Sequence, residues 1–469
     1  MAQENDSRFA IIATLLAFGL VGGISLLLWA LTGRLDQAVQ LQSNSGLALD
    51  EALPESVKSR VSMGGKTLFD TDSEEKEEGV EAIAQGNYAN AITVFNTALS
   101  DNPNDPETFI YRSNARIGDE AALVIAVVAP AGDASAIGLE ILRGAAQAQD
   151  DINRNGGIDG TPIRLVLVND GNDPDTATTI AENLIADPLV LGVVGHYSSD
   201  VTLATAPIYA EGELVTITPV STAVDLSGIS PYLYRTVPTD SFAAAALSAY
   251  MLYYREDRNV SVFYDSASEP SSSLKEEFNS FVSAWGGDVM EEYDMSDDFS
   301  ANDAVAEDDA DILMLAASPD TLEAAAEVIQ ANNNTRPILG GDEIYNRYIL
   351  EETGSDAQAL TVAVPWHLLA RDTDADFVES SRDLWKGDVS WRTATAYDAV
   401  VAIATGLAED ASREGLKTAL DDSNFTVESA TGPINFLPSG DRRQVDRLVQ
   451  VEAGTRSGTG YDFVPFTLD

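Results

Sequence analysis

Two short segments combine hydroxyl-bearing side chains with small residues at positions typical of ligand-binding loops. Residues 195–200 have the sequence GHYSSD and residues 218–222 have the sequence TPVST, and each follows an apolar run. A serine between a strand and a helix usually caps the helix, which stabilises the helix by about 1 kcal/mol. Such a cap is the alternative to a ligand-binding role for Ser199. The same geometry also directs backbone N–H groups and the positive end of a helix outward. Two such segments predict a site for a small anion such as a carboxylate.

The apolar runs before these segments belong to a long alternation of predicted strands and helices. From about residue 121, apolar runs of strand length alternate with segments of 3.6-residue spacing, and a second such series begins with a helix at 240–255. Repeated strand–helix units with apolar strands predict parallel sheets that helices cover on both faces. Two series predict two doubly wound α/β lobes, with ligand-binding loops beyond the carboxyl ends of the strands.

The order and spacing of segments in residues 121–469 resemble those of type I periplasmic solute-binding proteins of the branched-chain amino acid family. The matching segments are INRNGGIDGTPIRLVLVNDGNDPDTA, VVGHYSSD, ITPVST, YRTVPTD and TAYDAV. Such proteins are extracytoplasmic receptors that supply ABC importers. The resemblance implies a binding domain over 119–469, with two lobes joined by a hinge and no cofactor or metal. We expect lobe 1 at about 119–238 and 367–430, and lobe 2 at about 239–366 and 431–469.

The resemblance also implies which residues would hold an amino acid. Ser199 and Thr222 would bind the α-carboxylate, while the backbone carbonyl of Val220 and the carboxylate of Asp342 would bind the ammonium group. Glu343 is the second choice for that acid. Charge-assisted hydrogen bonds in a closed cleft are strong, and a zwitterion needs donors at one end and acceptors at the other. The candidate ligand-binding residues are Tyr197, Ser199, Val220, Ser221, Thr222 and Asp342.

Several positions depart from the family pattern. Where the family often has aromatic side chains around the ligand, this chain has Ile137, Pro270 and Ser318. Other aromatic residues are candidates to replace them, or else pack in the core or hinge: Tyr197, Trp366 and Tyr397. The sequence therefore predicts an amino acid or a related polar solute as ligand, and leaves its side chain undetermined.

The composition excludes several classes of function. The 469 residues include 27 lysines and arginines against 76 aspartates and glutamates, a net charge of −49 that would repel nucleic acid. The chain has no cysteine and only two histidines, His196 and His367, which argues against disulfides, thiolate sites and histidine metal clusters. Acidic residues spread along the whole chain suggest a halophilic protein, because high salt screens their repulsion. The alternative is an ordinary acidic secreted protein.

The N-terminal part predicts a membrane anchor. Residues 9–33 carry no charged side chain, and a helix of this length spans roughly 37 Å, more than the ~30 Å hydrocarbon core. The exit sequence LWALTGRL is a poor cleavage site, which favours an uncleaved transmembrane helix over a signal peptide. We expect residues 1–8 to be cytoplasmic, residues 34–72 to form a tether, and the bulk of the chain to lie outside the cell membrane.

Residues 73–118 predict a helical hairpin. Apolar residues recur there at helical spacing in two segments separated by Gly86-Asn87. The placement of small and aromatic residues resembles a single tetratricopeptide repeat, in which small residues let two helices approach closely. Because one such repeat cannot bury both of its faces, a helical spacer packed against the next domain is the alternative to a peptide-binding groove.

These observations together predict a membrane-tethered, non-catalytic, extracytoplasmic solute-binding protein of an ABC importer, with permease subunits as partners and no nucleic acid. A ligand-binding sensor subunit for a signalling partner is the main alternative. A scaffold that has lost its ligand is a second. An extracytoplasmic hydrolase is a third, because His196 lies close in sequence to Ser198 and Ser199.

Overall fold

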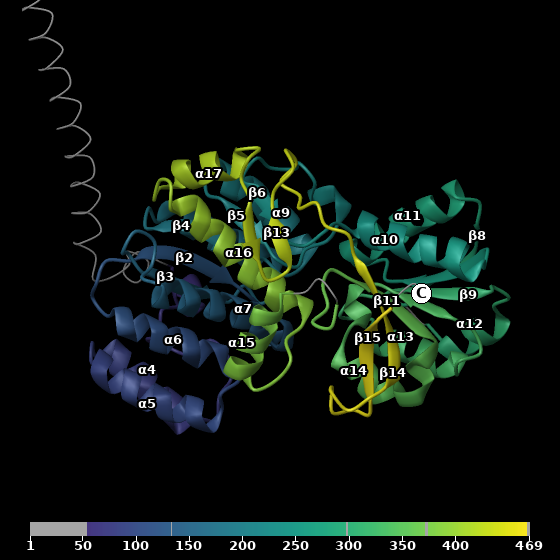
Figure 1. The fold of residues 1–469 in the computed structure, drawn as a ribbon, viewed down its shortest axis with the longest axis horizontal. Coiled ribbons are helices and arrows are strands. Elements are labelled where there is room, and N and C mark those ends of the chain that lie inside the picture. The colour runs from purple at the N-terminus through teal and green to yellow at the C-terminus, as the bar shows by residue number, and fades with distance from the viewer. Residues whose placement is uncertain (1–53, 133, 297–298, 371–373, 467–469) are drawn as a thin grey trace, which may run out of the picture.

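A computed structural model describes residues 54–132, 134–296, 299–370 and 374–466 of the chain (Figure 1). The cytoplasmic tail predicted for 1–8 and the transmembrane helix predicted for 9–33 lie outside these residues. Within the described ranges, no helix combines the length and the hydropathy that a membrane span requires.

The first described residues pack on the sheet of lobe 1, where a tether was predicted. After the short helix α3 (Glu55–Lys58), strand β1 (Val61–Ser62) pairs antiparallel with β3 (Ile163–Val168). The side chains of Val57 and Val61 are buried against that sheet, and this burial holds the segment in place. The C-terminal part of the predicted 34–72 tether is therefore an edge of the folded domain.

The helical hairpin is present and a third helix follows it. Gly79 in α4 (Glu74–Ala84) faces Phe95 in α5 (Tyr88–Asp101), and a Cβ at position 79 would lie 2.3 Å from that ring. Only glycine allows this close approach. Helix α6 (Pro106–Ile117) then packs on α7 (Ser135–Arg154) of lobe 1. The hairpin is thus attached to the domain through α6.

Lobe 1 is built on a six-stranded sheet with strand order β1-β3-β2-β4-β5-β6, parallel except for β1. Side chains alternate between its faces, so that Ile125 and Val127 pack under α7 and α16, while Val124 and Ala126 pack under α8 and α9. The remaining elements are β2 (Leu123–Val128), β4 (Val190–Val194), β5 (Thr216–Thr218), β6 (Leu233–Arg235), α8 (Pro174–Ala186), α9 (Ser199–Glu211), α16 (Trp391–Leu407) and α17 (Arg413–Asp421).

Lobe 2 is built on a seven-stranded mixed sheet with strand order β15-β14-β11-β10-β9-β7-β8. Strand β14 pairs antiparallel with both β11 and β15, and the other five strands pair parallel with one another. Helices α10 and α11 cover one face, and α13 and α14 cover the other. The elements are β7 (Asn259–Tyr264), β8 (Asp288–Asp294), β9 (Ile312–Ala316), β10 (Ile338–Gly340), β11 (Leu360–Val364), β14 (Arg447–Ala453), β15 (Tyr461–Pro465), α10 (Asp240–Ala249), α11 (Glu269–Ala284), α13 (Leu322–Asn332) and α14 (Arg347–Thr353).

The predicted two-lobe α/β fold is therefore confirmed, and the lobes lie side by side in Figure 1. The chain leaves lobe 1 after β6 and returns after β11, near the predicted 238 and 366. The third crossing follows Arg442, later than the predicted 430. Strand β12 (Val427–Ser429) packs on α16 and pairs with β13 (Gly432–Ile434), and the Arg442 guanidinium lies 2.7 Å from Asp398 in α16. Burial of this ion pair keeps residues up to 442 in lobe 1.

Candidate ligand-binding site

A cavity of about 140 Å³ lies between the two lobes, beyond the carboxyl ends of their strands. Its volume is below the roughly 300–1,000 Å³ of pockets for drug-sized molecules, so it suits the backbone part of an amino acid or another small solute. Lobe 1 contributes the loops after β4 and β5, and lobe 2 contributes those after β7, β9 and β10. Five predicted site residues line this cavity together: Tyr197, Ser199, Val220, Thr222 and Asp342.

The sixth predicted residue, Ser221, does not line the cavity. Its hydroxyl oxygen lies 2.8 Å from that of Thr202 and accepts a hydrogen bond from Thr218 at 2.9 Å. The Ser221 hydroxyl also lies 3.0 Å from the backbone carbonyl of Tyr197. Ser221 therefore connects the two lobe 1 loops on the side away from the cavity. It positions the residues that face the cavity.

Ser199 is not the helix cap. The cap of α9 is Ser198, whose hydroxyl accepts a hydrogen bond from the Val201 N–H group at 3.4 Å. Ser199 is the first helical residue, and its hydroxyl oxygen accepts a hydrogen bond from the Ala223 N–H group at 3.2 Å. Its hydroxyl proton is thus available to a ligand oxygen, beside the positive end of the α9 dipole.

Asp240 lines the same cavity and was missed in the sequence. It begins α10 at the first crossing between the lobes, and its side chain is buried, with only 3% exposed. The hydroxyls of Ser273 and Thr222 favour the charged carboxylate, but burial outweighs them and raises the pKa of Asp240 to about 6. In the sequence, Asp240 is the last residue of YRTVPTD. It could not be distinguished there from the acidic residues that commonly begin helices.

Asp342 faces the cavity from lobe 2. It starts the short 3-10 helix η3 (Asp342–Ile344) directly after β10. Burial, and then the neighbouring negative charge of Glu343, raise the pKa of Asp342 to about 7. A cation placed beside this carboxyl would relieve both effects, because it favours the charged form.

Glu343 differs from its neighbour in having protein partners across the cleft. Its carboxylate lies 3.0 Å from the guanidinium of Arg392 in α16 and accepts a hydrogen bond from the Tyr197 hydroxyl at 3.2 Å. The Arg392 guanidinium also stacks 4.4 Å above the Trp391 ring. Arg392 precedes the TAYDAV segment in the sequence and was not predicted. These contacts pair Glu343 with a cation of the protein, whereas among the described residues no ion pair reaches the Asp342 carboxyl, which also lines the cavity.

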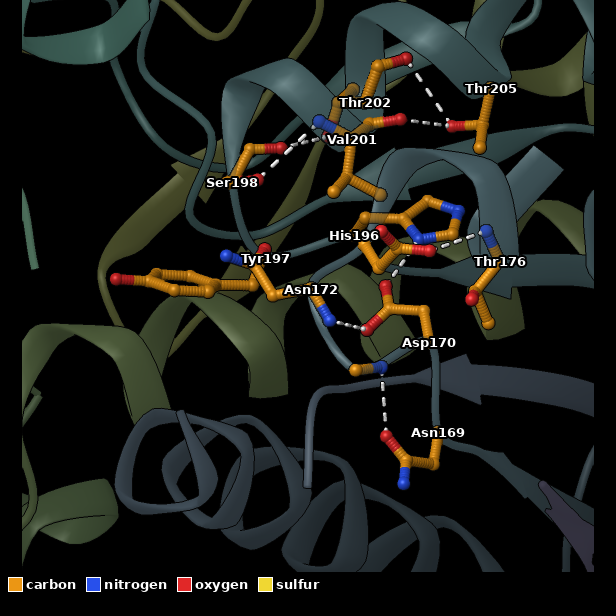
Figure 2. A network of polar contacts seen from close by, with 12 residues as sticks. Asn169, Asp170, Asn172, Thr176, His196, Tyr197, Ser198, Val201, Thr202 and Thr205 are labelled. Carbon is orange, nitrogen blue, oxygen red and sulfur yellow. Dashed lines mark hydrogen bonds and ion pairs between the residues drawn. The ribbon is translucent and has the colours of Figure 1, made fainter. Parts of the chain in front are cut away.

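His196 does not line the cavity, and its buried ring faces Asp170 inside lobe 1, as Figure 2 shows. Its Nδ1 atom lies 2.7 Å from the Asp170 carboxylate and its Nε2 atom lies 3.1 Å from the Tyr209 hydroxyl. Both ring nitrogens are therefore engaged, and the ring does not reach the hydroxyls of Ser198 or Ser199. The arrangement of histidine and serine on which the hydrolase alternative depended is not formed. Within the described ranges, no group of three metal-ligating side chains is positioned to hold an ion.

The walls of the cavity are small and polar. Pro270 and Ser318 line it, and the Ser318 hydroxyl donates a hydrogen bond to Asp265. Ile137, Trp366 and Tyr397 do not line it: Ile137 packs against the core, and the two aromatic rings pack against Phe377. Among the aromatic candidates named from the sequence, Tyr197 is the one at the cavity.

Comparisons with known proteins agree with the two-lobe architecture. Residues 124–457 match the family described as periplasmic binding protein. The Leu/Ile/Val-binding protein BraC3 of Rhizobium johnstonii is 27% identical over 349 residues, which cover 71% of this chain and 93% of that protein. The crystal structure of a leucine-binding protein LivK of Thermotoga maritima is similar with a TM-score of 0.64 and 22% identity, over 73% of this chain and 98% of that one. A solute-binding protein from R. palustris in complex with benzoate is similar with a TM-score of 0.61 and 20% identity, over 74% and 96%.

Proposed function

The chain belongs to the periplasmic binding protein family, and on this premise we propose that it is an extracytoplasmic solute-binding protein that holds an amino acid between two closing lobes. The observation that carries the proposal is the shared cavity. It brings Ser199 and the N-terminus of α9 to one side, and the Asp342 carboxyl to the other. A hydroxyl with a helix dipole suits a carboxylate, and the acid suits an ammonium group.

The hinge supports closure of the lobes around the ligand. Three segments of chain connect the lobes, after β6, after β11 and before β14. Closure around a small solute buries it and creates a surface that differs from that of the open form, which a membrane partner can recognise. The relatives named for leucine, isoleucine and valine support an amino acid as ligand, and the polar cavity walls argue against a branched apolar side chain.

Ligand binding can be tested with the full-length protein purified in detergent. A thermal-shift screen of the twenty amino acids, urea and short amides should find at least one amino acid that raises the midpoint of unfolding, because a ligand that binds only the native state stabilises it. Calorimetry should then give a one-to-one complex. If no amino acid shifts the midpoint and benzoate or another non-zwitterion does, the proposed ligand class is wrong.

We further propose that residues 9–33 anchor this receptor in the membrane and that it serves an ABC importer. Membership of the family implies an extracytoplasmic location, and the uncharged segment has the length of a membrane span. Deletion of residues 1–53 should release the protein from the membrane fraction. Deletion of the gene should abolish uptake of the ligand. Normal uptake combined with loss of a response to the ligand would instead indicate a sensor.

For the helical hairpin we propose the role of a spacer with the packing of one tetratricopeptide-like repeat. Gly79 against Phe95 supports this comparison, and α6 fixes the hairpin to lobe 1. Lys76 of α4 is buried between Asp105 at 2.9 Å and Glu107 at 2.8 Å, which ties α4 to the start of α6. Such a fixed hairpin would hold the cleft at a constant distance from the anchor.

A further inference from the structure

The cavity between the lobes is lined by acidic side chains from both of them. Among its lining residues there is no lysine, arginine or histidine. The acids lie at the starts of α9 and α10, in the loops after β7 and β9, and in η3 after β10. They are Asp200, Asp240, Asp265, Asp320, Asp342 and Glu343. A zwitterionic amino acid with a neutral side chain brings one cationic group to this cavity, and one carboxylate is enough to pair with it.

Partners within the protein account for some of these acids and not for others. Glu343 is paired with Arg392, and Asp265 accepts hydrogen bonds from the Ser318 hydroxyl and the Ala267 N–H group. In contrast, the Oδ2 atom of Asp240 is buried without a hydrogen-bond partner, and over the described part of the chain no ion pair reaches Asp240 or Asp342. Two carboxyls therefore face the cavity without a cation.

The burial of Asp240 separates it from the general acidity of the chain. A net charge of −49 explains carboxylates on a solvated surface, but the Asp240 side chain is 3% exposed. A carboxylate at such a site loses its hydration, and the hydroxyls of Ser273 and Thr222 replace it only in part, because the Oδ2 atom has no hydrogen-bond partner among the described residues. A position of this kind is stabilised when a ligand supplies the missing positive charge.

A second, wider acidic cleft adjoins the cavity on the side of Asp240. It has a volume of about 450 Å³ and shares Asp200, Ala267 and Ser268 with the cavity, while Ser273, which hydrogen-bonds Asp240, lines the cleft. Its carboxylates come from lobe 1 and from α11 of lobe 2, and they are Asp200, Asp225, Glu269, Glu276 and Glu277. Burial, followed by the charges of Asp225 and Asp200, raises the pKa of Glu269 to about 7. The negative potential thus extends from the cavity outward past Asp240.

We propose that the ligand is a cationic amino acid, with a side chain that ends in a second ammonium or a guanidinium group, and that Asp240 binds this side-chain cation. The inference rests on the proposed function, in which Asp342 binds the α-ammonium group. The two carboxyls then pair with the two cationic groups of one ligand. The side chain points toward the acidic cleft, which also attracts the ligand during association.

The experiment compares lysine with norleucine, which has the same chain without the cation, by calorimetry on the full-length protein in detergent. We expect lysine, ornithine or arginine to bind at least about tenfold more tightly than norleucine, since a close buried charge pair contributes more than 1.4 kcal/mol. Asp240→Asn should reduce this preference to within about threefold, because the ratio of the two affinities measures the partner of the side-chain cation. Asp288→Asn, which removes an exposed acid of β8, should change neither affinity.

Three outcomes would contradict the inference. If norleucine binds the wild-type protein as tightly as every cationic amino acid, the ligand class is wrong, although the proposed function stands. If Asp240→Asn keeps the full preference for the cation, Asp240 is not its partner. If no amino acid binds at all, the proposed function itself fails. The wild-type comparison decides the ligand class even if the variant does not fold, and norleucine binding reports whether it does.

Discussion

Arg392 in lobe 1 and Glu343 in lobe 2 form an ion pair across the ligand cleft, with 3.0 Å between the guanidinium nitrogen and the carboxylate oxygen. The Tyr197 hydroxyl reaches the same carboxylate from the loop after β4, at 3.2 Å. The Arg392 side chain is almost fully buried, so the pair is shielded from solvent. Side chains of the protein itself therefore join the two lobes beside the cavity that the ligand would occupy.

Glu343→Gln should shift the protein toward an open form. Removing one charge takes the closest carboxylate away from the buried Arg392 guanidinium when the lobes are joined, which disfavours that state by about 3–5 kcal/mol. Small-angle scattering of the ligand-free variant should give a larger radius of gyration. The matched control is Glu351→Gln, which removes a carboxylate of the exposed Arg347–Glu351 pair on α14. An unchanged radius in both variants would show that this pair does not hold the cleft closed.

Asp342→Ala should weaken amino-acid binding by about 2–5 kcal/mol, because the ligand ammonium group would be buried without its partner. Calorimetry on the purified variant measures this loss. Asp288→Ala serves as the control, since the exposed carboxylate of Asp288 lies in β8 away from the cavity. Equal affinity in the wild type and the Asp342 variant would remove this carboxyl from the site.

Ser199→Ala should have a smaller effect, a loss of roughly 1–3 kcal/mol in binding free energy, because the backbone donors at the N-terminus of α9 remain. The variant also removes the acceptor for the Ala223 N–H group, so the loop after β5 is expected to loosen. Calorimetry and the midpoint of thermal unfolding together separate the two effects. A loss of affinity larger than that of Asp342→Ala would contradict the assignment of the two ends of the ligand.

The sequence predicted the strands and loops well because each has a local signal. Apolar runs such as residues 121–130 contain buried strands, and the carboxyl ends of these strands carry Ser199 and Asp342 to one cavity as expected. The Ser198 cap next to Ser199 could not be distinguished from it, because both serines follow a strand and precede a helix. One-residue differences of this kind depend on where the first helical hydrogen bond forms.

Contacts between segments far apart in the sequence could not be predicted, because no local sequence pattern indicates them. Arg392 lies in a helix of mostly small apolar residues, and its partner Glu343 is 49 positions away. Asp240 has the position of a common helix-start acid, and only the burial by both lobes distinguishes it. Likewise, β1 has two residues and no strand pattern, so its pairing with β3 depends on tertiary burial of Val61.

The contribution of Asp240 and Asp342 to stability without ligand should fall as the pH rises from about 4 to 7. The pKa values of Asp240 and Asp342 in the folded protein are raised to about 6 and about 7, above the ~3.9 of an unfolded aspartate. Between these values the folded state binds more protons than the unfolded state, so each group lowers stability by up to about 1.4 kcal/mol per pH unit.

Urea denaturation at several pH values measures this slope. Asp342→Asn should have a shallower slope than the wild type, because one of the two groups no longer titrates. A bound cation favours both carboxylates, so ligand affinity should increase over the same pH range. Identical slopes in the variant and the wild type would show that burial does not raise the pKa of Asp342.

Salt should stabilise the protein. With a net charge of −49, carboxylates repel one another over the whole surface, and the cleft beside the cavity gathers Glu276 and Glu277 of α11 with Asp225 of lobe 1. At molar salt the Debye length is about 3 Å, so this repulsion is screened. The free energy of unfolding should therefore rise by several kcal/mol between about 0.1 M and 2 M KCl.

The double variant Glu276→Gln, Glu277→Gln is the control for screening. It should be more stable than the wild type at low salt, and its stability should depend less on KCl. A general effect of salt on the burial of apolar surface would instead be the same in both proteins. A folded state as stable at low ionic strength as in molar salt would end the halophilic interpretation.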